Sequence, residues 1–234
     1  MSKKLIVNAD DFGQSDGINK GIILAHEKGI VTSASLMVRY PRAIDAARYA
    51  TDNPSLGIGL HIDLGEWIFK NDQWEALYEV VSLDDYEDIK VEIEKQLETF
   101  YKIMNKAPTH IDSHQHVHLK QRVLPIVIEI AQSANVHLRN YSPNVKYCGK
   151  FYGQLDDGSP FHYGTSIKRL QEIILEFDDG LYELSCHPGV GDDVKSMYVL
   201  EREREVNTLC DLAIKECITR ADIELCSFDG IGFS

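Results

Sequence analysis

Short apolar runs alternate along the chain with longer segments in which apolar residues recur every three or four positions. The short runs are typical of strands that are covered on both faces, and the longer segments are typical of amphipathic helices. We predict strands at 4–9, 31–38, 56–62, 108–112, 136–139, 181–186 and 224–228. We predict helices at 16–28, 41–53, 84–105, 121–133, 166–178 and 199–217.

The regular alternation of strand and helix favours a mostly parallel sheet. Seven strands and six helices fit either an open doubly wound sheet or a β/α barrel with one unit missing. No glycine-rich phosphate loop follows the first strand, so nothing favours dinucleotide binding. The chain of 234 residues is 44% hydrophobic and contains no repeat or linker, so we expect a single α/β domain over residues 1–234.

The net charge of −13 changes the range of functions to consider. A strongly acidic surface argues against nucleic acid and against anionic membranes, because both attract basic proteins. Only three strongly apolar residues follow the first four, which is too short for a signal peptide. No apolar run reaches the length of a membrane span. We therefore predict a cytoplasmic protein with a small-molecule partner.

Polar side chains follow several of the predicted strands. They are Asp10 and Asp11 after the first strand, His61 after the third, His110, Asp112 and His114 at the fourth, Arg139 after the fifth and His187 after the sixth. The carboxyl ends of parallel strands lie at one face of the sheet, so these groups are expected to be neighbours. One histidine at a strand end is usually structural, but several beside an Asp pair favour a catalytic metal site.

The histidines of the fourth strand need to be distinguished from one another. On a continuous strand His110, Asp112 and His114 would share one face. The strand is expected to end near residue 112, so this parity is not reliable beyond Ser113. We select His114 as the metal ligand and keep His110 as the alternative.

Two long insertions, at 63–82 and 140–165, are rich in aromatic residues. Trp67, Trp74 and Tyr141 are candidates for stacking on sugar rings, and packing within the loops is an equally good explanation. The Glu/Arg run at 201–205 is expected to form a solvated helix face with pairs at i,i+3 and i,i+4.

Several motifs together resemble the YdjC/ChbG-like family of carbohydrate deacetylases. The matching segments are 5–13, 29–34, 59–61, 109–118 and 186–188, in the same order as in that family. The resemblance implies a seven-stranded parallel barrel-like fold, related to that of polysaccharide deacetylases. It also implies a divalent metal and hydrolysis of N-acetyl groups from sugars such as chitooligosaccharides.

The resemblance also implies roles for individual residues. Asp11, His61 and His114 would bind the metal, Asp10 would be the general base and His187 the general acid. Arg139 would orient Asp10 or bind substrate. The resemblance suggests Mg²⁺, whereas imidazole ligands favour Zn²⁺.

Two other functions stay open at this point. One is a metal-dependent phosphoesterase, which would usually need more cationic groups than Arg139 alone. The other is a non-catalytic sugar-binding protein that retains a metal. The identity of the sugar and the oligomeric state, including a homodimer, also stay open.

Overall fold

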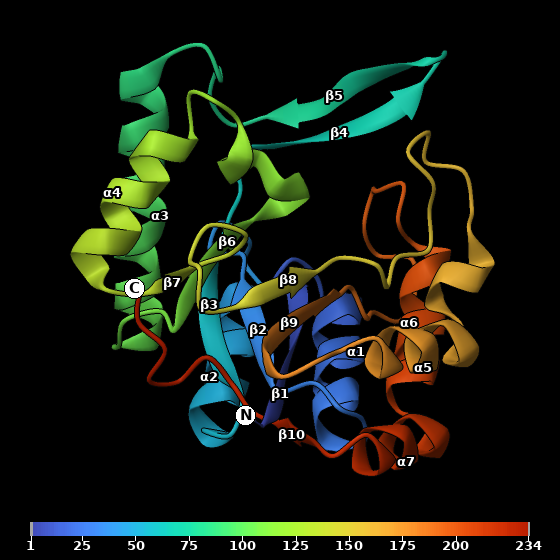
Figure 1. Cartoon of the computed structure of the whole chain (residues 1–234). Coiled ribbons are helices and arrows are strands. Elements are labelled where there is room, and N and C mark those ends of the chain that lie inside the picture. The colour runs from blue at the N-terminus through green and yellow to red at the C-terminus, as the bar shows by residue number, and fades with distance from the viewer. Residues whose placement is uncertain (1, 234) are drawn as a thin grey trace.

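The strands of the main sheet all run parallel and form a curled half-barrel with helices around its outer face (Figure 1). The computed structural model describes residues 2–233. The strands lie in the order β7-β6-β3-β2-β1-β9-β8, and β10 pairs with the start of β1. The sheet consists of β1 (Lys3–Phe12), β2 (Ser33–Leu36), β3 (Gly57–Ile62), β6 (His110–Ser113), β7 (His137–Leu138), β8 (Lys146–Cys148), β9 (Gly180–Cys186) and β10 (Ile223–Leu225). The predicted barrel-like α/β fold is confirmed.

The helices lie close to the segments predicted from the pattern, with one exception. They are α1 (Asp16–Glu27), α2 (Ala43–Asp52), α3 (Tyr86–Met104), α4 (Leu124–Ala134), α5 (Ile167–Leu175), α6 (Leu200–Leu209) and α7 (Leu212–Arg220). The helix predicted at 199–217 is wrong as a single element, because Asp211 breaks it. The side chain of Asp211 accepts a hydrogen bond from the backbone N–H of Ala213 and so caps a new helix. Within residues 2–233 no helix is long and apolar enough to cross a membrane.

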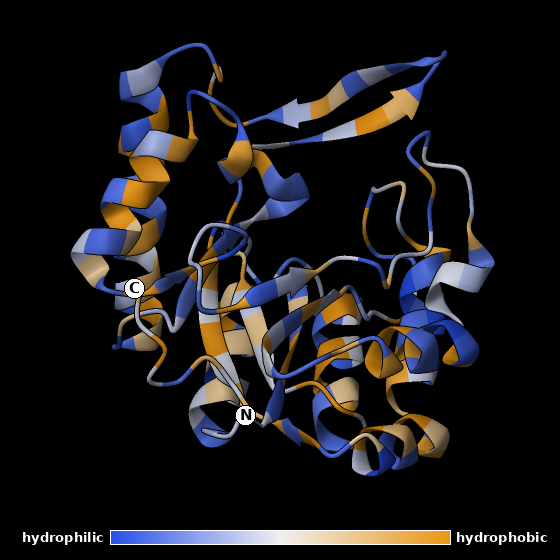
Figure 2. Cartoon of the chain, in the orientation of Figure 1, coloured by the Kyte–Doolittle hydropathy of each residue, from blue (hydrophilic) through white to orange (hydrophobic). Residues whose placement is uncertain are grey.

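The two faces of the curled sheet differ in polarity. On β1, Leu5, Val7 and Ala9 join the hydrophobic core beneath the helices. The alternate positions include Asn8 and Asp10, which are buried on the other face and make side-chain hydrogen bonds there. Figure 2 shows the apolar residues of the helices turned largely toward the sheet. The strands therefore alternate between an apolar outer face and a buried polar inner face, a pattern that leads directly to the site.

Three strands inside the insertions were not predicted. A hairpin of β4 (Gly65–Lys70) and β5 (Gln73–Glu79) occupies the first insertion, and β8 lies in the second. Asn71 and Asp72 form the hairpin turn with φ of 53° and 60°, the left-handed conformation that a two-residue turn of this kind requires. The hairpin extends across the top of the molecule toward the loops before α5 and α6 (Figure 1).

Candidate metal and catalytic site

A bulge at the end of β1 turns two consecutive carboxylates toward one pocket. The register between β1 and β2 shifts between Ala9 and Phe12, and Asp11 has a φ of 69°. Adjacent residues of a regular strand point to opposite faces, whereas a bulge with a left-handed residue re-aims a side chain. Asp10 and Asp11 therefore both line the same pocket.

Asp11, His61 and His114 form a buried cluster at the mouth of the half-barrel. Oδ1 of Asp11 lies 3.3 Å from Nε2 of His61 and 2.9 Å from Nδ1 of His114. One ligand atom from each of the three residues lies within 4.8 Å of the others. The cluster contains the three residues that the sequence singled out as metal ligands.

Each histidine of the cluster has a second carboxylate on its far side. Nδ1 of His61 lies 2.7 Å from Asp112, and Nε2 of His114 lies 3.6 Å from Glu66. Burial would lower the pKa of both rings, but these carboxylates and Asp11 outweigh it. The pKa rises to about 10 for His61 and about 9 for His114.

The donor set fits a divalent cation. Two imidazoles and a carboxylate are the usual protein ligands of a catalytic metal site. Ligating histidines typically present their other nitrogen to a carboxylate, as His61 does to Asp112. A second possible group, which consists of Asp10, His61 and Asp112, also lies close enough. Arg139 pairs with both carboxylates of this second group, whereas Arg202 pairs with Oδ2 of Asp11 and leaves its Oδ1 facing His61 and His114, so the first group fits better.

Arg139 holds Asp10 in a bidentate pair. Nη1 and Nη2 of the guanidinium donate to the two carboxylate oxygens at 2.6 Å and 2.7 Å. The same buried guanidinium contacts Asp112 at 2.7 Å and Glu183 at 2.6 Å. Burial would raise the pKa of Asp10, but Arg139 outweighs it and the pKa lies below the ordinary value. Asp10 is therefore ionised at neutral pH, and its orientation is fixed.

His187 lies beside Asp10 in the loop that follows β9. Its Nε2 is 3.7 Å from Oδ2 of Asp10, and 21% of its side-chain surface stays accessible. The loop approaches α1 so closely that a Cβ on Gly21 would lie 2.3 Å from Cα of Gly189. Burial lowers the pKa of His187 to about 4, so the ring is neutral at pH 7. A resting, protonated acid was expected at this position.

The prediction of a solvated face for residues 201–205 is wrong at three positions. Glu201, Arg202 and Glu205 are at most 5% exposed. Nη2 of Arg202 donates to Oδ2 of Asp11 at 2.6 Å. Glu205 accepts hydrogen bonds from the backbone N–H of His187 and from the hydroxyl of Tyr198. Charges spaced at i,i+4 fit a solvated helix as well as a buried one, so the sequence contained no signal for the buried contacts of Arg202 and Glu205.

Other candidate residues lie apart from the cluster. His110 stacks on Phe228 with ring centroids 4.0 Å apart and belongs to neither possible metal group. Tyr141 packs against Phe233 and is not among the residues that line the main pocket. Asp112, Glu66, Arg202 and Glu205 were not assigned roles from the sequence.

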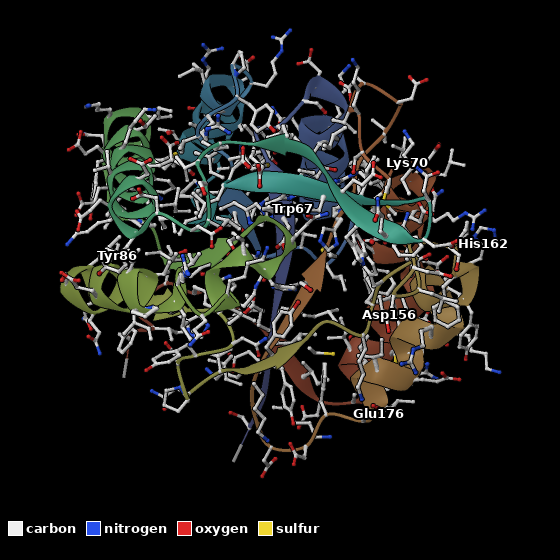
Figure 3. All side chains as sticks on the ribbon, turned by 90° about the horizontal axis from the view of Figure 1, so that it is seen from above. Trp67, Lys70, Tyr86, Asp156, His162 and Glu176 are labelled. Carbon is white, nitrogen blue, oxygen red and sulfur yellow. The ribbon has the colours of Figure 1, made fainter. Side chains whose placement is uncertain are left out.

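The pocket above the cluster has a volume of about 670 Å³. Asp10, Asp11, His61, His114 and His187 all line it. Aromatic side chains complete its walls, namely Trp67, Trp74, Tyr147, Tyr152 and Tyr198. Seen from above, the hairpin crosses the molecule from Trp67 near the centre to Lys70 near the edge (Figure 3). The pocket has room for a ring-shaped polar substrate above Asp10, His187 and the cluster of Asp11, His61 and His114.

Comparison with known sequences gives the family. The sequence model of the YdjC-like protein family matches residues 4–220, so the chain belongs to this family. A protein of Clostridium beijerinckii named carbohydrate deacetylase is 32% identical over 252 residues, covering 97% of this chain and 100% of the relative. A protein of Citrobacter koseri named chitooligosaccharide deacetylase is 31% identical over 256 residues, covering 97% of this chain and 99% of the relative.

Solved structures support the fold. A protein of Enterococcus faecalis V583 has a TM-score of 0.82 at 25% identity, and the match covers 99% of this chain and 100% of that protein. Its description gives cellobiose-phosphate cleavage only as a provisional role. A family 4 carbohydrate esterase from Streptomyces lividans, in complex with acetate, has a TM-score of 0.57 at 9% identity. That match covers 96% of this chain and 91% of the esterase, and it shows a shared fold.

Proposed function

We propose that the protein is a metal-dependent hydrolase that removes N-acetyl groups from small sugars or oligosaccharides of the chitooligosaccharide type. The observation that carries the proposal is the meeting of two groups in one aromatic-lined pocket. These are the oriented pair of Asp10 and His187 and the cluster of Asp11, His61 and His114. The names of the curated relatives support the class of substrate.

Asp11, His61 and His114 would hold a divalent ion. When bound, the ion would polarise the acetyl carbonyl and acidify a water molecule. We propose Mg²⁺ from the resemblance to the family and keep Zn²⁺ as the alternative that imidazole ligands favour. Both remaining ring nitrogens face carboxylates, which orients the ligands.

Asp10 acts as the general base in this proposal. Its carboxylate is ionised because Arg139 holds its pKa below the ordinary value against the effect of burial. The same bidentate pair prevents the side chain from rotating away. Asp10 accepts a proton from the attacking water as the new carbon–oxygen bond forms.

His187 acts as the proton donor to the leaving nitrogen. Its ring is neutral at rest, so it must receive a proton at Nε2 before it donates one. Asp10 lies 3.7 Å from this atom and supplies the proton taken from water. The proton then moves to the amide nitrogen as the carbon–nitrogen bond breaks, which leaves acetate and an amino sugar.

The test is acetate release from N-acetylglucosamine oligomers by the purified protein, with and without a chelator. We expect acetate in the presence of Mg²⁺ or Zn²⁺ and a loss of release after chelation. Phosphate release from sugar phosphates without any acetate release would favour a phosphoesterase instead. Oligomer binding without any turnover would favour a sugar-binding protein.

A further inference from the structure

The hairpin β4–β5 contacts the metal-ligand cluster through a carboxylate. Glu66 is the second residue of β4 and is only 2% exposed. Its Oε2 atom lies 3.6 Å from Nε2 of His114. That nitrogen is buried and has no hydrogen-bond partner within residues 2–233. Glu66 is therefore placed to accept an N–H from the side of His114 that faces away from Asp11.

The adjacent residues connect the same two segments. The side-chain amide of Gln115 accepts from the backbone N–H of Trp67 and donates to its carbonyl oxygen, both at 2.8 Å. This pairing imitates the two hydrogen bonds that a neighbouring strand would make. Gln115 and His116 have φ of 48° and 52°, a left-handed conformation that costs about 1–2 kcal/mol for each residue other than glycine. Such backbone persists only where its surroundings hold it.

Each histidine of the cluster lies beside a second carboxylate, but the two carboxylates come from different parts of the fold. His61 contacts Asp112, which belongs to β6 of the main sheet and lies opposite His61 in the pairing of β3 with β6. His114 contacts Glu66, which belongs to a two-stranded hairpin outside that sheet. The hairpin also provides Trp67 and Trp74 to the pocket wall.

We infer that Glu66 is a positioning residue for His114, and that it makes the hairpin part of the metal site. This inference rests on the proposed function, because it requires His114 to bind the metal. Metal binding then favours the hairpin position seen here, and a sugar stacked on the hairpin favours metal binding in return. The coupling is reciprocal because both ligands bias the same element.

The first experiment measures Zn²⁺ binding to the full chain by competition with a chromophoric chelator. We expect Glu66→Ala to weaken binding by about 10–100-fold, the usual loss when the partner of a ligating histidine is removed. Glu66→Gln keeps an acceptor without the charge and should lose less. Glu79→Gln is the matched control, because it removes an exposed carboxylate from the other strand of the hairpin and should bind Zn²⁺ as wild type does.

The second experiment measures hydrogen exchange of the β4 backbone amides with and without Zn²⁺. We expect Zn²⁺ to slow exchange at Trp67–Phe69 in the wild type, and Gln115→Ala to reduce this protection. If the hairpin had only a structural role, Gln115→Ala would change the exchange rate by the same factor with and without Zn²⁺. This readout does not depend on activity.

The outcomes separate the inference from the proposed function. Zn²⁺ binding by the wild type, together with unchanged binding by folded Glu66→Ala and Glu66→Gln, would overturn the inference alone. Exchange rates of the β4 amides that stay the same with and without Zn²⁺ would also overturn the inference about Glu66. No binding of either Zn²⁺ or Mg²⁺ by the wild type would overturn both proposals, and if only Mg²⁺ binds, the same variants are compared with Mg²⁺. Circular dichroism checks the fold, and Glu66→Gln provides the comparison if Glu66→Ala does not fold.

Discussion

His110 is the first residue of β6 and His114 directly follows its last residue, and the fold gives the two histidines opposite properties. His114 lies among carboxylates, and Asp11 and Glu66 raise its pKa to about 9 despite burial. His110 stacks on Phe228, and burial lowers its pKa to about 4. A Cβ on Gly59 would lie 2.3 Å from the His110 ring, so only glycine permits this close packing.

The difference teaches that the neighbours of a buried histidine decide its role here. Around His114, close carboxylates favour a cationic ring or a ring that binds a cation. Around His110, a stacked aromatic ring and the loss of hydration favour the neutral form. The same residue type therefore serves as a candidate ligand in one place and as packing in the other.

Removing a ligand should give the largest effect. We expect His61→Ala and His114→Ala to lose bound metal and acetate release, because only two of the three proposed protein ligands would remain in each variant. His110→Asn should keep its metal, since His110 lies outside the cluster. Elemental analysis of the purified variants checks this contrast, and equal metal loss in His110→Asn would contradict it.

Replacing the proposed base, Asp10, should give the next largest effect. Asp10→Asn should retain the metal and lose about 10²–10⁴-fold in kcat, the range of general acid–base assistance. Steady-state acetate release with metal analysis on the same samples measures both quantities. A kcat close to that of the wild type would show that Asp10 is not the base.

The low pKa of His110 predicts that the free energy of unfolding depends on pH. The unfolded chain binds a proton at His110 below its ordinary pKa of 6.5, whereas the folded chain does so only near 4. The free energy of unfolding therefore falls as the pH drops from about 7 to 4, by about 3 kcal/mol from this residue. Urea unfolding across this range should give a shallower slope for His110→Gln, and parallel slopes would contradict the prediction.

The pocket wall should give the smallest effect. Trp74 is 52% exposed and lines the pocket. We expect Trp74→Ala to raise KM about 2–10-fold with little change in kcat, because a stacking contact is worth about 0.5–1.5 kcal/mol. Tyr141→Ala is the control and should leave both constants unchanged, since Tyr141 packs on Phe233.

Much of the fold followed from the sequence because strand and helix periods differ clearly. The mouth of the half-barrel was predictable for the same reason, since polar residues followed successive strands. The choice between His110 and His114 could not be made from periodicity, because the two residues share strand parity and only their packing, on Phe228 or beside Asp11 and Glu66, distinguishes them. These packing contacts are tertiary features without a periodic signal.

The residues of α6 show a different limit. The sequence predicted Arg202 and Glu205 to be solvent-exposed, because the spacing of residues along a helix does not show which of its faces packs against the rest of the protein. Only the packing of α6 beside α1 brings Arg202 to Asp11. The hairpin was missed because its β5 strand is largely exposed and has no buried face to produce an alternating pattern.

Arg202 and Asp11 are 191 positions apart in the chain, and Arg139 and Asp10 are 129 apart. Contacts of such sequence separation close large loops and form slowly during folding. The site therefore has no local precursor, and no short fragment of the chain holds it. We expect the ability to bind a metal to appear only at the end of refolding, which makes metal capture a direct signal that the whole chain has reached its native topology.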